Sequence, residues 1–168
     1  MERVRLKTVV VGAGAAGKTC MLIRLVHDRF PEVYIPTVFD CESHEGTVGN
    51  VPCTMGLFDT GGGEDYHTLR PHSYPGTHVF TLLYSITDNM DEIESLFDYW
   101  CPELEHHCPG VPIVLVASKI DLRQDSQNNM ETLSKADGER IASRMNAAAF
   151  VEISSKTGRV SLNYLINY

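Results

Sequence analysis

Several features that would mark a membrane, secreted or nucleic-acid-binding protein are missing from this sequence. No apolar run approaches the roughly 20 residues that a transmembrane helix needs. The N-terminus also lacks the apolar core of a signal peptide. No run of five or more lysines and arginines occurs, and the net charge is −8. A surface that follows the phosphates of a nucleic acid is therefore not expected.

The cysteines form no pattern that predicts disulfides or a metal site. Their number is odd and no two are spaced as Cys-x-x-Cys; they are Cys20, Cys41, Cys53, Cys101 and Cys108. Reduced thiols in a cytoplasmic protein explain this usage better than a disulfide framework. The sequence ends in Leu-Ile-Asn-Tyr and not in a prenylation box. We expect either that the protein has no such anchor or that a tail able to recruit it to membranes has been removed.

Short β-branched runs alternate with helix-like segments along the whole sequence. With 168 residues, 43% of them hydrophobic, residues 1–168 can form one core but not two. Strands are predicted over residues 6–11, 41–48, 51–58, 79–84, 113–117 and 150–153, with Gly49-Asn50 as a hairpin turn. Helices are predicted over 18–28, from about 88 past 104 with a kink at Pro102, over 136–145, and from about 158 onwards. This alternation predicts an α/β fold with an open, six-stranded, mostly parallel sheet, helices on both faces and one antiparallel hairpin strand.

The most specific motif follows the first predicted strand and opens the first helix. Residues 12–19 read Gly-Ala-Gly-Ala-Ala-Gly-Lys-Thr and match the pattern G-x-x-x-x-G-K-[ST]. Its glycines let the chain curl so that backbone N–H groups and the helix N-terminus face phosphate oxygens. In such a loop Lys18 bridges the β- and γ-phosphates, and the Thr19 hydroxyl ligates Mg²⁺. An ordinary glycine-rich turn would not explain Lys18-Thr19, so we predict a nucleotide phosphate site.

A second motif predicts which base is bound. Ser118-Lys119-Ile120-Asp121 follows a predicted strand, at the sheet edge where ligands of such folds bind. A carboxylate at Asp121 could accept from guanine N1–H and the 2-amino group, donors that adenine lacks, while the Lys119 stem covers the base. Alone, a Lys-x-Asp pair is usually a pair of solvated charges. Phe30, just past the first helix, either stacks on the base or packs in the core.

These motifs resemble the Ras superfamily of small GTPases, and within it the Rho branch, over nearly the whole chain. The Rho-like strings are Gly17–Cys20, Tyr34–Asp40, Glu64–Tyr66, Leu69–Pro71, Ser73–Pro75, His106–Pro109 and Asp121–Arg123. The resemblance implies a P-loop G domain that binds GTP or GDP with Mg²⁺. It also implies a signalling switch, with cytoskeletal signalling as the typical role of the branch.

The resemblance also assigns roles to residues that the motifs alone leave undecided. Without it, Thr37 could be any loop threonine and Asp59 any aspartate at the end of a strand. With it, Thr37 would contact Mg²⁺ and the γ-phosphate, Asp59 would hold Mg²⁺ through water, and Tyr34 would lie over the phosphates. The Gly62 N–H would bond the γ-phosphate, and the backbone of residues 154–156 would touch the guanine oxygen. The expected nucleotide-binding residues are then Gly12, Ala13, Gly14, Ala15, Ala16, Gly17, Lys18, Thr19, Cys20, Phe30, Tyr34, Thr37, Asp59, Gly62, Ser118, Lys119, Asp121, Leu122, Ser154, Ser155 and Lys156.

The main departure from the family pattern lies where the family usually reads Asp-Thr-Ala-Gly-Gln-Glu. Residues 59–64 here read Asp-Thr-Gly-Gly-Gly-Glu. Gly63 therefore replaces the glutamine whose side chain orients the attacking water. The catalytic residues expected from the resemblance are Lys18, Thr37 and Gly62. Position 63 would also belong to this set, but as Gly63 it has lost the glutamine side chain. Three consecutive glycines should also leave residues 61–69 poorly ordered without a partner.

Smaller departures affect the phosphate loop, the base loop and the partner surface. Ala13 replaces a usual aspartate, although Gly14 and Ala15 still leave room for transition-state partners. Ser118 stands where asparagine or threonine is usual, and a hydroxyl can substitute. His72 occupies a usually apolar position that partners grip. The polar segment after residue 123 is shorter than the insert of Rho proteins, so partners that depend on the insert are not expected.

Three functions remain open on the sequence. The first is a regulated switch enzyme with slow GTP hydrolysis, and the second is a binding module that stays loaded with GTP. The third, an adenine-specific ATPase or kinase, is disfavoured by Asp121. The expected partners are effectors at residues 34–40 and 61–74, an exchange factor, an activating protein and a dissociation inhibitor. We expect a monomer that binds no nucleic acid.

Overall fold

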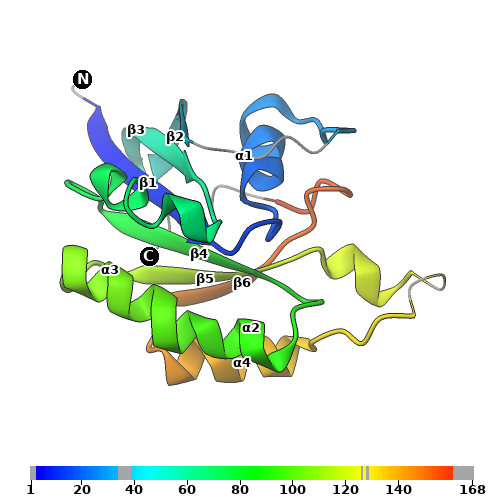
Figure 1. Cartoon of the computed structure of the whole chain (residues 1–168). Helices are drawn as coiled ribbons and strands as arrows, with labels where there is room; N and C mark the ends of the chain where they lie inside the picture. Colours follow the sequence, from blue (N-terminus) through cyan, green and yellow to red (C-terminus); the bar gives the residue numbers. More distant parts are fainter. Residues whose placement is uncertain (1–2, 34–38, 126, 128, 161–168) are drawn as a thin grey trace.

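A computed structural model of the chain describes residues 3–33, 39–125, 127 and 129–160 (Figure 1). Its sheet has six strands in the order β2-β3-β1-β4-β5-β6. Only the β2–β3 hairpin pairs antiparallel; the other four pairs are parallel. The strands are β1 (Val4–Gly12), β2 (Phe39–Val48), β3 (Val51–Thr60), β4 (Val79–Ser85), β5 (Ile113–Ser118) and β6 (Ala149–Glu152). This is the predicted mostly parallel sheet, with its hairpin turn at Gly49-Asn50.

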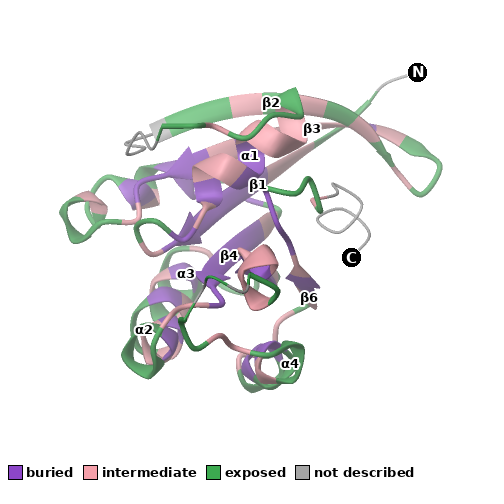
Figure 2. Cartoon of the chain, turned by 90° about the vertical axis from the view of Figure 1, so that its right-hand side faces the viewer, coloured by how far each residue is buried: buried purple, intermediate pink, exposed green. Residues whose placement is uncertain are grey.

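Helices cover both faces of the sheet. Helix α1 (Lys18–His27) packs on one face, where Met21 and Leu22 meet Val10, Leu57 and Leu83. The other face is covered by α2 (Met90–Ser95), α3 (Cys101–His107) and α4 (Lys135–Arg144). Figure 2 shows the buried residues in the layers between these helices and the sheet. The helix predicted from about residue 158 lies mostly outside the described residues.

The central strands send alternate side chains into the two cores. Along β4, Leu82 and Tyr84 lie in the core under α3 and α4, whereas Leu83 lies in the core under α1. Strand β1 does the same with Val9 and Val10. Parallel strands with helices on both faces are buried on both sides, and this is why these segments read as continuous apolar runs. No described helix has the length and apolar character that a bilayer span requires.

The predicted interruption at Pro102 takes the form of a wider helical turn. Residues Leu96–Trp100 are π-helical (η3) and separate α2 from α3. At this turn the Cys101 N–H bonds the carbonyl of Leu96, five residues earlier. Pro102 has no N–H to continue the α-helical pattern, which accounts for a break at this point. Asn89 caps the N-terminus of α2, and its side chain forms a capping box with Glu92.

Candidate functional site

The loop between β1 and α1 has the curled shape that its glycines predicted. Gly12 has φ 140° and lies so close to β4 that a Cβ would sit 2.3 Å from the Leu83 carbonyl oxygen. Gly17, at the start of α1, has φ 99°. Neither conformation suits a larger residue. The Lys18 ammonium lies inside this loop and donates to the carbonyls of Gly12 and Ala13, both at 2.7 Å.

Lys18 is a buried cation, only 6% exposed. Burial lowers its pKa to about 8; the nearby Asp59 carboxylate opposes that shift and Arg70 adds to it. The charged form is therefore poorly compensated by the protein alone. An anion bound in the loop would offset this cost, so the electrostatics fit a phosphate ligand.

Two oxygen groups suited to Mg²⁺ lie together beside the loop. The Thr19 hydroxyl donates to Oδ2 of Asp59 at 2.5 Å, and Asp59 is buried at the end of β3. A hydroxyl and one carboxylate fit Mg²⁺, which takes few protein ligands and completes its shell with water and phosphate oxygens. Within the described residues no group of three or more His, Cys, Asp and Glu side chains could hold a metal. Thr37, the third expected ligand, and Tyr34 lie outside the described residues.

The glycines after β3 differ in what surrounds them. A Cβ on Gly62 would lie 2.4 Å from the Gly12 carbonyl oxygen and 2.5 Å from Lys18 Nζ, so Gly62 rests directly on the phosphate loop. A Cβ on Gly63 would meet only the Tyr66 ring, at 3.5 Å, an ordinary contact. Close approach therefore requires glycine at 62, whereas no such contact requires it at 63.

The loop after β5 is tied to both the phosphate loop and the loop after β6. Lys119, with φ 64°, donates from Nζ to the Ala15 carbonyl at 2.8 Å. The Ser118 hydroxyl donates to the Ala16 carbonyl at 2.5 Å. Ser154 donates to Oδ1 of Asp121 at 2.6 Å. These contacts hold the predicted base-binding carboxylate and the predicted phosphate loop together at the carboxyl ends of the parallel strands.

The surroundings of the other predicted residues differ from one residue to the next. Phe30 is 42% exposed, so core packing does not explain it. Leu122 packs partly against the core, and Cys20 is half-buried with its pKa raised by that burial. Arg24 holds the loop after β6 by donating to the carbonyls of Ser155 and Lys156.

Sequence reasoning missed two ion pairs that support the site. Arg123 and Glu152 pair at 2.6 Å and join the loop after β5 to the end of β6. Arg70 pairs with Glu103 at 3.0 Å and joins the segment after β3 to α3. The only sequence signal was the family-like string containing each arginine. Neither string indicates a partner 29 or more residues away.

A family model described as the Ras family matches residues 7–165. The chain therefore belongs to the Ras family, and it is a GTP-binding small GTPase. Proteins of this family bind GTP and GDP with Mg²⁺, hydrolyse GTP, and engage effectors, exchange factors and activating proteins.

Proposed function

We propose that this small GTPase is a Rho-like signalling switch whose GTP hydrolysis is slow because Gly63 replaces the water-positioning glutamine. The observation that carries the proposal is the place of Gly63. It directly follows Gly62, which rests on the phosphate loop, and it opens the 3₁₀ turn η1 (Glu64–Tyr66). A side chain at 63 would therefore start beside the phosphate site, and glycine offers none there.

The other site residues would act on the nucleotide as follows. Lys18 and the N–H groups of the phosphate loop would neutralise the phosphates, and Asp121 would select guanine. Thr19, Asp59 and Thr37 would hold Mg²⁺, with Asp59 acting through water. When bound, the ion would counter charge that develops on the phosphate oxygens. Because these groups remain, the rate should be small and not zero.

The partner surface would include the second switch, residues 61–74. A cavity of about 270 Å³ lies there, lined by Thr60, Gly61, Tyr66, Leu69, Arg70, His72 and Ser73. Leu69 is 55% exposed at its edge. An apolar effector side chain would fit this cavity. The first switch, residues 34–40, would form the other part of the partner surface. We further propose that the protein acts in cytoskeletal signalling, that residues 1–168 form one domain, and that the protein is a monomer.

The test is single-turnover hydrolysis of GTP by the Gly63→Gln variant. Losing a positioned amide removes about 1.4–2.8 kcal/mol of transition-state stabilisation, or one to two decades in rate. Restoring it should raise the rate at least about fivefold. Gly46→Gln is the matched control: Gly46 lies in β2 with no atom near its Cβ position, and this variant should leave the rate unchanged. An unchanged rate in Gly63→Gln would show that another group holds the water.

The second candidate function is a binding module that stays loaded with GTP and hydrolyses none. The same glycine favours it, because loss of the amide weakens the chemical step and not the binding of GTP. Nucleotide extracted from the purified protein after a day at 25 °C separates the two. A measurable fraction of GDP would support the slow enzyme, whereas undiminished GTP would support the module.

A further inference from the structure

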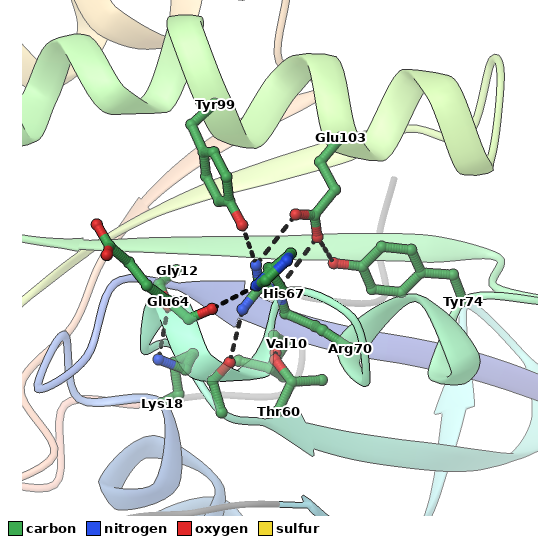
Figure 3. Close-up of polar contacts among 11 residues, drawn as sticks. Val10, Gly12, Lys18, Thr60, Glu64, His67, Arg70, Tyr74, Tyr99 and Glu103 are labelled. Carbon is green, nitrogen blue, oxygen red and sulfur yellow. Dashed lines mark hydrogen bonds and ion pairs between the residues drawn. The ribbon is translucent and has the colours of Figure 1, made fainter.

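One buried arginine ties the start of the second switch to its later part. Arg70 opens the 3₁₀ turn η2 (Arg70–Ser73) and is 3% exposed. Its Nη1 donates to the Gly61 carbonyl at 2.9 Å (Figure 3). The first residue after β3 is thus held by a side chain nine residues further along.

Residues of η3 and α3 hold the Arg70 guanidinium in place. Nε and Nη2 each donate to a different oxygen of Glu103 at 3.0 Å, and Nη2 also donates to the Tyr99 hydroxyl at 2.5 Å. The guanidinium carbon lies 4.5 Å from the centre of the Trp100 ring. A bidentate pair with a ring beneath it leaves the guanidinium little freedom to turn.

The pair is well matched electrostatically despite its burial. Burial by itself would lower the pKa of Arg70, but the hydrogen bonds and charge of Glu103 raise it above its usual value. Burial would raise the pKa of Glu103, but bonds from Arg70 and then Tyr74 lower it. Both groups therefore stay charged, and the contact to Gly61 is a charge-assisted hydrogen bond.

The carbonyl that Arg70 holds belongs to the same peptide group as the Gly62 N–H. In a trans peptide the C=O and N–H point in opposite directions. Arg70 binds the oxygen on one side, and Gly62 rests on the phosphate loop beside Gly12 and Lys18. The Gly62 N–H therefore points away from Arg70, and it belongs to the residue whose Cβ position borders the phosphate loop.

Three consecutive glycines make an external restraint on this peptide necessary. Glycine can rotate its backbone into regions closed to other residues, so peptides between glycines turn easily. On the other side, the Thr60 hydroxyl donates to the Val10 carbonyl at 2.7 Å and anchors the end of β3 (Figure 3). Beyond Thr60, the bond from Arg70 restrains the direction of the Gly61–Gly62 peptide.

We propose that Arg70, held by Glu103, is a positioning residue that aims the Gly62 N–H at the γ-phosphate of GTP. The inference rests on the proposed γ-phosphate contact of Gly62. Arg70 thereby favours the triphosphate over the diphosphate and links the phosphate site to α3. GDP, which lacks the γ-phosphate, gains nothing from this orientation.

The experiment compares the affinity of the Mg²⁺-loaded protein for GDP with its affinity for a non-hydrolysable GTP analogue. In Arg70→Gln, the triphosphate affinity should fall at least about fivefold while the GDP affinity stays within about twofold, as expected for one lost charge-assisted bond. Glu103→Gln keeps both Arg70 and an acceptor, and should shift the ratio less in the same direction. General destabilisation would weaken both nucleotides equally. Arg144→Gln is the matched control, because Arg144 also pairs bidentately with a glutamate, Glu94, and lies over a ring, Phe97.

Gly62→Ala separates failure of this inference from failure of the γ-phosphate contact itself. Its Cβ would push residue 62 away from the phosphate loop and so move its N–H away from the γ-phosphate, which should reduce triphosphate affinity more strongly than GDP affinity. If it does so and neither Arg70→Gln nor Glu103→Gln changes the ratio, Arg70 is not a positioning residue. If Gly62→Ala leaves the ratio unchanged, the proposed contact of Gly62 is wrong and the inference falls with it. Should Arg70→Gln fail to fold, Glu103→Gln and the milder Tyr99→Phe decide the question.

Discussion

Asp121 shows how much a single residue of this site depends on its neighbour. Its Oδ1 accepts from the Ser154 hydroxyl at 2.6 Å, and this bond restricts rotation of the carboxylate. A carboxylate fixed in this way can face two adjacent donors, as guanine N1–H and its amino group would require. Adenine would leave the same acceptor unsatisfied, at a cost of about 1–3 kcal/mol.

The Asp121→Asn variant should bind GTP at least about tenfold more weakly and shift its preference toward xanthine nucleotide. The 2-oxo group of xanthine suits an amide donor, whereas guanine then meets a mismatched one. Competition by GTP, ATP and XTP for the same protein measures the shift. Asp125→Asn, an exposed change four residues further along, should not alter the order of preference. Equal competition by ATP against the unmodified chain would refute guanine selection by Asp121.

At the scale of elements, the second switch combines firm ends with a weakly held middle. Arg70 and Ser73 of η2 are buried, and Gly61 is held by Arg70. Between them, the described backbone bonds are short-range ones, such as Tyr66 N–H to the Gly63 carbonyl at 3.1 Å and Leu69 N–H to the Tyr66 carbonyl at 3.1 Å. Turns held by local bonds at an exposed surface open at low free energy.

Amide hydrogen exchange should therefore be fast over residues 63–69 in the partner-free, GDP-bound protein. Each glycine adds roughly 0.5–1 kcal/mol of ordering cost relative to alanine, so the GTP-bound form should be only modestly slower. The backbone amides of η2, the turn that carries the buried Arg70, are measured in the same experiment and serve as its internal reference. Protection over 63–69 equal to that of η2 would contradict a mobile second switch.

At the scale of the whole molecule, burial of the charged Lys18 side chain in the proposed phosphate site lowers the stability of the folded protein. The pKa of Lys18 falls from 10.5 to about 8, with burial as the largest cause. A lowered lysine pKa means that the folded state disfavours the charged form. The resulting loss of stability is fully present below about pH 8 and is relieved as the pH rises toward 10.5. Its size is about 3 kcal/mol.

Nucleotide-free Lys18→Met should consequently be more stable than the unmodified chain at pH 7, by up to about 3 kcal/mol. The difference should shrink as the pH rises from 8 toward 10.5, and urea unfolding at several pH values measures it. With GTP present the order should reverse, because only the lysine gains from the phosphates. A difference that does not change with pH would show that Lys18 burial costs nothing in the folded protein.

The sequence by itself determined the features that depend on residues close together in the chain. The phosphate loop, the hairpin at Gly49-Asn50, the strand–helix alternation and the break near Pro102 all follow from local spacing, because backbone geometry depends on adjacent residues. The same local strings were enough to indicate the family. Only the tertiary structure brought together Arg70 with Glu103, Arg123 with Glu152, and Ser118 with Ala16. Each pair is 29 to 102 residues apart, so its contact depends on strand register and helix packing, which no local pattern specifies.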